Sequence, residues 1–277
     1  MGDSITEGLG DPISPSMPDA WRGWADRLAL VLAAHAAAAG HPFAYANLAV
    51  RSRRVADVVD DQIPLALAQN ADLVSIMVGA NDLTGRAADP DRLAANLEQG
   101  VVALRKIGCT VLLANSFDPH FATVMRPLRG RAAIFNSHVW TIAATHGAHI
   151  IDLWGTRALQ RHDMRSEDRV HLSPRGHALV ARLSANALGV HPDTVASVSG
   201  LLADRESASL PFHSWLGAHA LPWVARRLRG KAAGDGRSPK RPHLQPVAPP
   251  SRVPAHHNGV VLAPPVTPLA DERMARH

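Results

Sequence analysis

Apolar positions recur at helical spacing in several long segments of the chain. Between residues 20 and 39, the side chains of Trp21, Trp24 and Leu28 fall three or four positions apart, and Gly40 ends the pattern. Such spacing places apolar side chains along one face of an α-helix. The same pattern predicts helices over residues 53–69, where Pro64 must kink or divide the helix, and over 89–107, 129–146 and 174–188.

Short apolar runs lie between these helices. Residues 73–78 form an almost unbroken run of this kind, which suits a strand that is covered on both faces of a sheet. The other predicted strands are residues 43–50, 109–115 and 149–153. Because the strands alternate with long helices, we expect crossover connections and a parallel sheet with helices on both sides.

The segments outside this alternation differ in composition. Residues 9–19 are rich in glycine and proline, and we expect a loop there that faces the substrate. After residue 189 the periodicity weakens, apart from an amphipathic segment at 211–229. That segment fits a helix packed on the domain better than a membrane-surface or partner helix. We therefore expect a domain at 1–190, a helical extension at 191–231 and a disordered Pro/Arg/His-rich tail at 232–277.

The charge balance is basic, with 29 Lys and Arg against 24 Asp and Glu. Much of the excess lies late, in residues 226–231 and 240–241. Aromatic residues make up 4% of the chain and are not interleaved with basic ones, so the sequence predicts no nucleic-acid partner. The single cysteine, Cys109, excludes an intramolecular disulfide, and we interpret it as a small buried apolar side chain.

The sequence shows no apolar stretch long enough to cross a membrane and no export signal at its start. On the condition that Met1 is the true start, we expect a cytoplasmic protein without stable membrane insertion. We also expect a monomer.

The first residues carry the first candidate for chemistry. Gly2 and Gly8 bracket Ser4 among turn-forming residues, ahead of a helical pattern. A serine on such a turn has an exposed hydroxyl near free backbone N–H groups, which are the parts that acyl transfer needs. Taken alone, however, a Gly-Asp-Ser triplet is more often a plain turn or a helix cap.

A serine nucleophile also needs a base, and the base needs a group that orients it. Asp168 and His171 lie three positions apart in the loop before the helix at 174–188, a spacing that lets the two side chains face each other. Asp118 and His120 form a competing pair. The proline between them favours an extended link, which directs those side chains apart.

Asn81 follows the predicted strand at 73–78 and would stand at the carboxyl edge of the sheet. Its amide could donate a hydrogen bond to a developing oxyanion, or it could simply cap the next segment. The turn after Val50 could supply a backbone N–H as well.

Together these pieces resemble the SGNH hydrolases, the GDSL-type esterases and lipases. Four sequence blocks carry the resemblance in order: residues 2–4 (Gly-Asp-Ser), 47–52 (Asn-Leu-Ala-Val-Arg-Ser), 79–82 (Gly-Ala-Asn-Asp) and 168–171 (Asp-Arg-Val-His). The resemblance spans roughly residues 1–190. It implies a three-layer α/β/α, flavodoxin-like fold and no metal or organic cofactor.

The resemblance also implies a role for each matching residue. Ser4 would be the nucleophile, His171 the general base and then general acid, and Asp168 the carboxylate that orients it. The oxyanion hole would combine the backbone N–H groups of Ser4 and Ser52 with the side chain of Asn81. The implied reaction is hydrolysis of a small carboxylic ester, such as a short-chain, acylated-sugar or lysophospholipid-like ester.

Two departures from the family pattern keep alternatives open. Ser52 stands where the family has glycine, and a positive φ there would add strain of about 1 kcal/mol. The hydrophobic strand that normally precedes the nucleophile is missing, so the sheet would carry a gap or be completed from elsewhere. The alternatives are a catalytically impaired interaction protein and an acyltransferase that uses the same residues.

Overall fold

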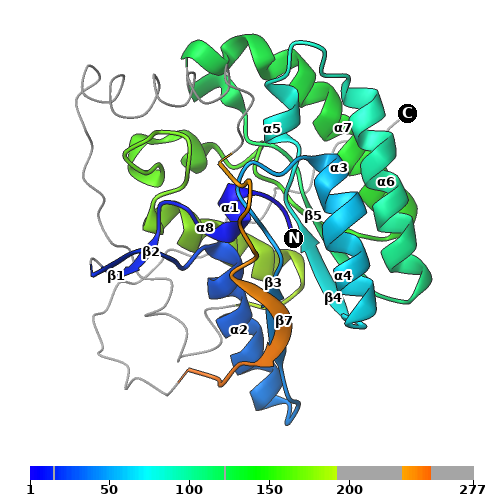
Figure 1. Ribbon diagram of the computed structural model, residues 1–277, viewed down its shortest axis with the longest axis vertical. Coiled ribbons are helices and arrows are strands. Elements are labelled where there is room, and N and C mark those ends of the chain that lie inside the picture. Colours follow the sequence, from blue (N-terminus) through cyan, green and yellow to red (C-terminus); the bar gives the residue numbers. More distant parts are fainter. Residues whose placement is uncertain (15, 122, 192–232, 251–277) are drawn as a thin grey trace, which may run out of the picture.

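A parallel sheet between two layers of helices forms the centre of the molecule (Figure 1). The computed structural model describes residues 1–14, 16–121, 123–191 and 233–250. In the order of the sheet, its strands are β4 (Leu73–Ile76), β5 (Thr110–Ala114) and β6 (His149–Ile151). All pairs are parallel, as the alternation of strands and helices predicts. The α/β/α architecture is therefore confirmed.

Two groups of helices cover the two faces of the sheet (Figure 1). One face carries α2 (Trp24–Ala38) and α8 (Pro174–Ala187). The other carries α3 (Val55–Asp57), α4 (Ile63–Ala68), α6 (Pro90–Lys106) and α7 (Arg129–His146). The short helices are α1 (Ser4–Glu7), α5 (Ala80–Leu83) and the 3-10 turns Pro119–Phe121, Thr123–Leu128, Arg157–Gln160 and His162–Met164.

The helix predicted at 53–69 is divided, as Pro64 requires. A π-helical turn, Val58–Gln62, separates α3 from α4, and Pro64 lies in the first turn of α4. Proline has no N–H to bond the carbonyl four residues earlier, so the regular helix cannot run through it.

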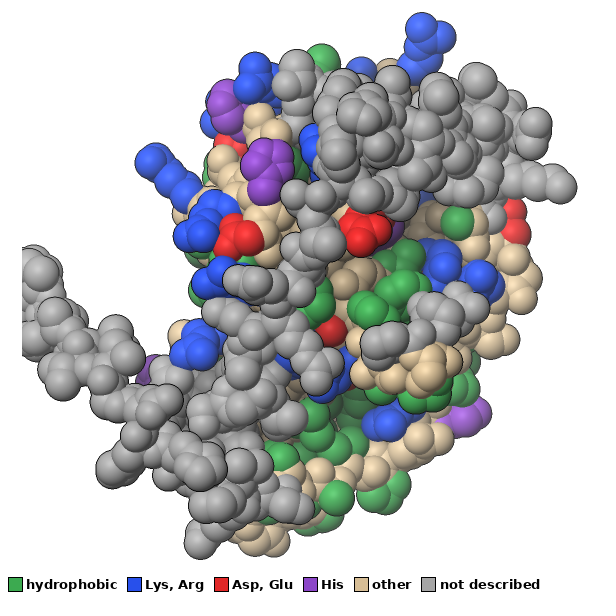
Figure 2. All heavy atoms as spheres, turned by 90° about the vertical axis from the view of Figure 1, so that its left-hand side faces the viewer, with side chains coloured by type: hydrophobic (Ala, Val, Ile, Leu, Met, Phe, Trp, Pro, Cys, Tyr) green, Lys and Arg blue, Asp and Glu red, His purple; other side chains and the backbone are tan. Residues whose placement is uncertain are grey.

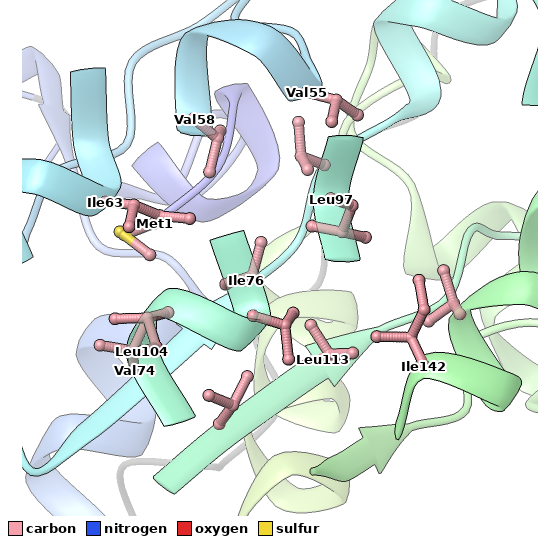
Figure 3. Close-up of a cluster of buried hydrophobic side chains, with 14 of the residues drawn as sticks. Met1, Val55, Val58, Ile63, Val74, Ile76, Leu97, Leu104, Leu113 and Ile142 are labelled. Carbon is pink, nitrogen blue, oxygen red and sulfur yellow. The ribbon is translucent and has the colours of Figure 1, made fainter. Parts of the chain in front are cut away.

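The central strand β5 is buried on both faces, and its side chains alternate between two cores. Val111 and Leu113 pack with the layer of α3, α4, α6 and α7, whereas Leu112 and Ala114 pack with α2 and α8. Figure 3 shows the first of these cores, where Leu113 lies near Ile76 from β4. The period-two alternation of a strand therefore supplies both cores from one apolar run.

The first two residues join the sheet to the segment that follows β3 (Ala44–Asn47). Gly2 forms a parallel bridge with Met77, and its carbonyl accepts a hydrogen bond from Val50 N at 3.4 Å. A Cβ on Gly2 would lie 2.2 Å from the Met77 carbonyl oxygen, so only glycine fits this close approach. Residues 1 and 2 thus fix where the chain enters α1.

Two predictions about irregular segments need correction. Within residues 9–19, expected as a loop, β1 (Pro12–Ser14) pairs in antiparallel fashion with β2 (Met17–Trp21). In the segment expected to be disordered, β7 (Arg241–Pro246) pairs in antiparallel fashion with β3. The extension predicted at 191–231 lies outside the described residues, except for its first residue, as does the tail beyond residue 250.

The prediction for Cys109 is confirmed, because its side chain is 1% exposed. Among the described residues, no helix combines the length and the apolar character that crossing a membrane requires. On the face shown in Figure 2, Lys and Arg side chains of the described residues are scattered among polar and hydrophobic ones.

Candidate active site

Ser4 is the first residue of α1, and its neighbour Asp3 caps that helix. The Asp3 carboxylate accepts a hydrogen bond from Ile5 N at 3.1 Å, which satisfies one of the free N–H groups at the helix start. The Ser4 N–H donates no hydrogen bond to a protein acceptor in the part of the chain that the structure describes. The turn therefore presents both a hydroxyl and an unused backbone donor.

The loop before α8 brings a histidine and a carboxylate to this hydroxyl. Ser4 Oγ lies 2.8 Å from His171 Nε2, and Asp168 Oδ2 makes a short hydrogen bond with His171 Nδ1. With its proton on Nδ1, facing the carboxylate, the imidazole can use Nε2 to accept a hydrogen bond from the serine hydroxyl. Residues 167 positions apart in the sequence thus form one chain of hydrogen bonds.

Local hydrogen bonds hold the Asp168 side chain in place. Its Oδ1 accepts from Ser166 Oγ at 2.7 Å and from the backbone N–H groups of Val170 and His171, both at 2.9 Å. The loop turns tightly at Arg169, whose φ is 60°. These bonds orient the second carboxylate oxygen toward the imidazole.

The same contacts set the charge of Asp168. Burial alone would raise the pKa of this carboxyl, but the hydrogen bond and charge of His171, with the backbone and Ser166 donors, hold the pKa well below its usual range. Asp168 therefore stays ionised and can stabilise an imidazolium.

The competing pair of Asp118 and His120 does not meet Ser4. Both Asp118 carboxylate oxygens bond to Arg129, at 2.9 and 3.0 Å, and Oδ1 also accepts from His120 N. The His120 side chain is exposed. This pair stabilises the start of α7 instead.

Of the two remaining oxyanion candidates, Ser52 lies in a tight turn. Its φ is 66°, in the left-handed region that favours glycine. The hydrogen bond from Arg53 N to Val50 O, at 3.4 Å, closes the turn. Among the described residues, no acceptor takes a hydrogen bond from Ser52 N.

The Asn81 side chain lies beside α1, but its donors are engaged. Nδ2 donates to Asp3 Oδ2 at 3.1 Å and to Arg53 O at 3.0 Å. These two bonds tie together the nucleophile turn and the turn at Ser52. To bind an oxyanion, the amide must redirect one hydrogen.

Asp3 is a buried carboxyl next to the nucleophile, with 3% of its surface exposed. Burial raises its pKa to about 6, and the nearby charge of His171 and the Ile5 N–H only partly offset that effect. Its role as cap and acceptor was not predicted from the sequence, where a Gly-Asp-Ser triplet gives no sign of burial.

A largely apolar pocket of about 130 Å³ opens beside Ser4 and Asn81. The segment after β5 contributes Phe117 and Phe121, and both rings stack on the guanidinium of Arg165, with its carbon 4.5 and 4.2 Å from the ring centres. Sequence reasoning missed these residues, because no local pattern marks side chains that meet only after folding.

The chemistry of the site rests on oxygen and nitrogen side chains. In the described part of the chain, no three His, Cys, Asp or Glu residues gather as a metal site would need. The arrangement offers a hydroxyl, an imidazole able to take its proton, and backbone N–H donors, which suits attack on a carbonyl carbon.

A model of the GDSL-like lipase/acylhydrolase family matches residues 1–179. No protein of curated function matches the sequence.

Similar solved structures share the fold at low identity. Axe2, an acetylxylan esterase from Geobacillus stearothermophilus, gives a TM-score of 0.55 at 22% identity, covering 69% of this chain and 93% of its own. LAE5, an α/β hydrolase enzyme from the metagenome of Lake Arreo, gives 0.53 at 21%, covering 68% and 92%. A putative GDSL-like lipase from Parabacteroides merdae gives 0.57 at 20%, covering 68% and 93%. Three further structures are catalytic mutants of Axe2 in which a serine, an aspartate or a histidine is replaced by alanine.

Proposed function

Because the chain belongs to the GDSL-like lipase/acylhydrolase family, we propose that it hydrolyses a carboxylic ester through an acyl-serine intermediate. The observation that carries this proposal is the line of contacts from Ser4 Oγ through the His171 ring to Asp168. The catalytic mutants of Axe2 replace the same three residue types, and there too the aspartate precedes the histidine by three positions.

In the first half-reaction, His171 Nε2 takes the proton of Ser4 as Oγ attacks the ester carbonyl. The ionised Asp168 stabilises the imidazolium and keeps its tautomer. His171 then gives the proton to the leaving alcohol, and the C–O bond breaks. In the second half-reaction the same histidine takes a proton from a water molecule that attacks the acyl-serine. It then returns this proton to Ser4 Oγ as the bond to the acyl carbon breaks and the acid leaves.

The unused N–H groups of Ser4 and Ser52 would bind the oxyanion of each tetrahedral intermediate. Asn81 would add a third donor by giving up its bond to Asp3 or to Arg53. Asn81 Nδ2 would then still donate two hydrogen bonds, one of them to the oxyanion.

The pocket supports a short acyl group. Its volume of about 130 Å³ lies below the roughly 300–1,000 Å³ of pockets that hold drug-sized ligands, so the pocket suits a short acyl chain. Its apolar lining suits the hydrocarbon part of such a chain. We therefore propose acetyl to butyryl esters as the preferred substrates, over esters of long fatty acids.

The test is hydrolysis of p-nitrophenyl acetate by the purified protein beside Ser4→Ala and His171→Ala. We expect each substitution to lower kcat by about 10³-fold or more. His138→Ala is the control, because this histidine lies on α7 and pairs with Asp91 at the surface. Equal rates for the wild type and Ser4→Ala would reject the esterase proposal in favour of a catalytically impaired interaction protein.

A further inference from the structure

A segment far outside the family match lies against the candidate site. We call residues 233–247 the C-terminal segment; it contains β7 and the turn before it, whereas the family match ends at residue 179. Figure 1 shows this part of the chain, in orange, running beside β3. Two of its residues, Gly234 and Lys240, contact the elements that carry Ser4 and Ser52.

Gly234 lies directly against the turn at Ser52. It is buried, and a Cβ on it would lie 2.0 Å from the carbonyl oxygen of Arg51. That oxygen belongs to the same peptide unit as the Ser52 N–H. Because a peptide unit is planar and trans, whatever fixes the direction of the Arg51 carbonyl also fixes the direction of the Ser52 N–H.

The sequence of residues 50–53 favours a different type of turn from the one observed. With a hydrogen bond from Arg53 N to Val50 O and a positive φ only at Ser52, residues 50–53 form a type II turn. A type I turn would relieve the strained φ of Ser52. It differs by a rotation of about 180° of the Arg51–Ser52 peptide, which would reverse the N–H. Something outside the turn must therefore favour the observed form.

Contacts on both sides of Arg51 supply that preference. The Arg51 N–H donates to Glu7 Oε2 at 2.7 Å, and the guanidinium pairs with the same carboxylate at 2.5 Å. Gly234 packs on the carbonyl side of the residue. Glu7 is the last residue of α1, the helix that begins at Ser4, so the turn is held between the nucleophile helix and the C-terminal segment.

Lys240 fastens the C-terminal segment to the same helix. Its Nζ donates to Glu7 O at 2.5 Å, to Trp21 O at 3.0 Å and to Asp26 Oδ2 at 2.6 Å. Three short bonds to three separate elements fix the ammonium group.

We propose that Gly234 is a positioning residue: by packing on the Arg51 carbonyl it keeps the Ser52 N–H in the orientation that binds the oxyanion. The proposal rests on the proposed function for the use of that N–H, but the contact itself does not depend on it. A residue that the family match does not include would thus set the geometry of the oxyanion hole.

The test compares Gly234→Ala with Gly130→Ala. The φ of neither glycine is in the positive range, and a Cβ on Gly130 would meet nothing within 4 Å, so the two variants differ in the contact with Arg51. With p-nitrophenyl acetate we expect Gly234→Ala to lower kcat by about 10- to 100-fold with little change in KM, measured well below the unfolding temperature. Gly130→Ala should keep the wild-type kcat.

A second substitution separates positioning from general damage. Glycine at position 52 favours the type II turn by itself, so Ser52→Gly should restore much of the kcat of Gly234→Ala. A role of Gly234 in stability alone would leave kcat per folded molecule unchanged in the single variant. That result, or a loss of kcat that Ser52→Gly does not rescue, would overturn the proposal.

The direction of the peptide can also be read without activity, from a crystal structure of Gly234→Ala. A rotated Arg51–Ser52 peptide supports the positioning contact even if the wild type proves inactive, a result that would count against the esterase alone. An unchanged peptide overturns the proposal whatever the activity.

Discussion

Ser52 has a backbone conformation that glycine adopts easily and that a residue with a side chain disfavours. At a φ of 66° a non-glycine residue is strained by roughly 1–2 kcal/mol, and glycine would relieve this strain. Glycine also gives the unfolded chain more conformational freedom, which lowers stability by about 0.4–1 kcal/mol. We therefore expect Ser52→Gly to be as stable as the wild type or up to about 1.5 kcal/mol more stable.

Urea denaturation measures this difference. Asn70→Gly is the matched control, because Asn70 has a φ of 49° and asparagine tolerates this region, so less strain is relieved there. A clear loss of stability in Ser52→Gly would mean that contacts of the serine side chain outweigh the strain.

Asp3 makes stability depend on pH. Its pKa is raised from 3.8 to about 6, so the folded state holds this proton more tightly than the unfolded state does. The folded state is therefore favoured at low pH, and this contribution is lost as the pH rises from about 4 through 6. The loss amounts to at most about 3 kcal/mol.

The measurement is the free energy of unfolding of the wild type and of Asp3→Asn between pH 4 and pH 7.5. Asparagine does not titrate, so the stability of the wild type relative to the variant should fall across this range. Asp61→Asn, at an exposed carboxyl outside the candidate site, should run parallel to the wild type. Parallel curves for Asp3→Asn as well would contradict the assigned pKa.

The sequence predicts the residues of the candidate site better than their contacts. Ser4, Asp168 and His171 lie in short motifs, and the structure brings them together. The partners of Asn81 could not be predicted in the same way. Asp3 and Arg53 reach that amide only because two turns from different crossover units meet at the end of the sheet.

Among the elements, β7 depends on contacts distant in the sequence. Its six residues include two prolines, a composition that is unusual for a strand and typical of a loop or a strand at a sheet edge. It forms because β3 offers an unpaired edge, and the side chain of Gln69 bonds Pro242 O and Leu244 N at 3.1 and 2.7 Å. The helices were easier to predict, since their periodicity is local.

Lys240, directly before β7, should be the strongest single attachment of the C-terminal segment. Lys240→Met keeps most of the aliphatic stem but removes the ammonium donor from two backbone carbonyls and one of the donors to the Asp26 carboxylate. We expect a loss of about 1–3 kcal/mol in the free energy of unfolding.

His243→Ala is the comparison within the same C-terminal segment, because the His243 side chain is exposed. It should change stability by no more than about 0.5 kcal/mol. Equal effects of the two substitutions in denaturant titrations would show that Lys240 has no special role.

For the whole molecule, the family match and the folded unit do not coincide. The match ends at residue 179, but the structure extends the domain to β7. We expect a chain cut after residue 250 to unfold at the wild-type temperature, because the cut leaves every described contact in place.

A chain cut after residue 232 loses the pairing with β3 and the bonds of Lys240. If these contribute about 2 kcal/mol, its Tm should fall by roughly 4–8 °C. Calorimetry of the two truncated chains decides the matter, and equal melting temperatures would mean that β7 adds nothing to the domain.

Cys109 directly precedes β5, and its buried thiol gives the protein a built-in reporter of opening. Its thiol is the chain's single sulfhydryl and is 1% exposed, so alkylating reagents can reach it only when the turn between α6 and β5 opens. The rate of labelling in native buffer would therefore follow the opening of this end of the sheet, and no engineered label would be required.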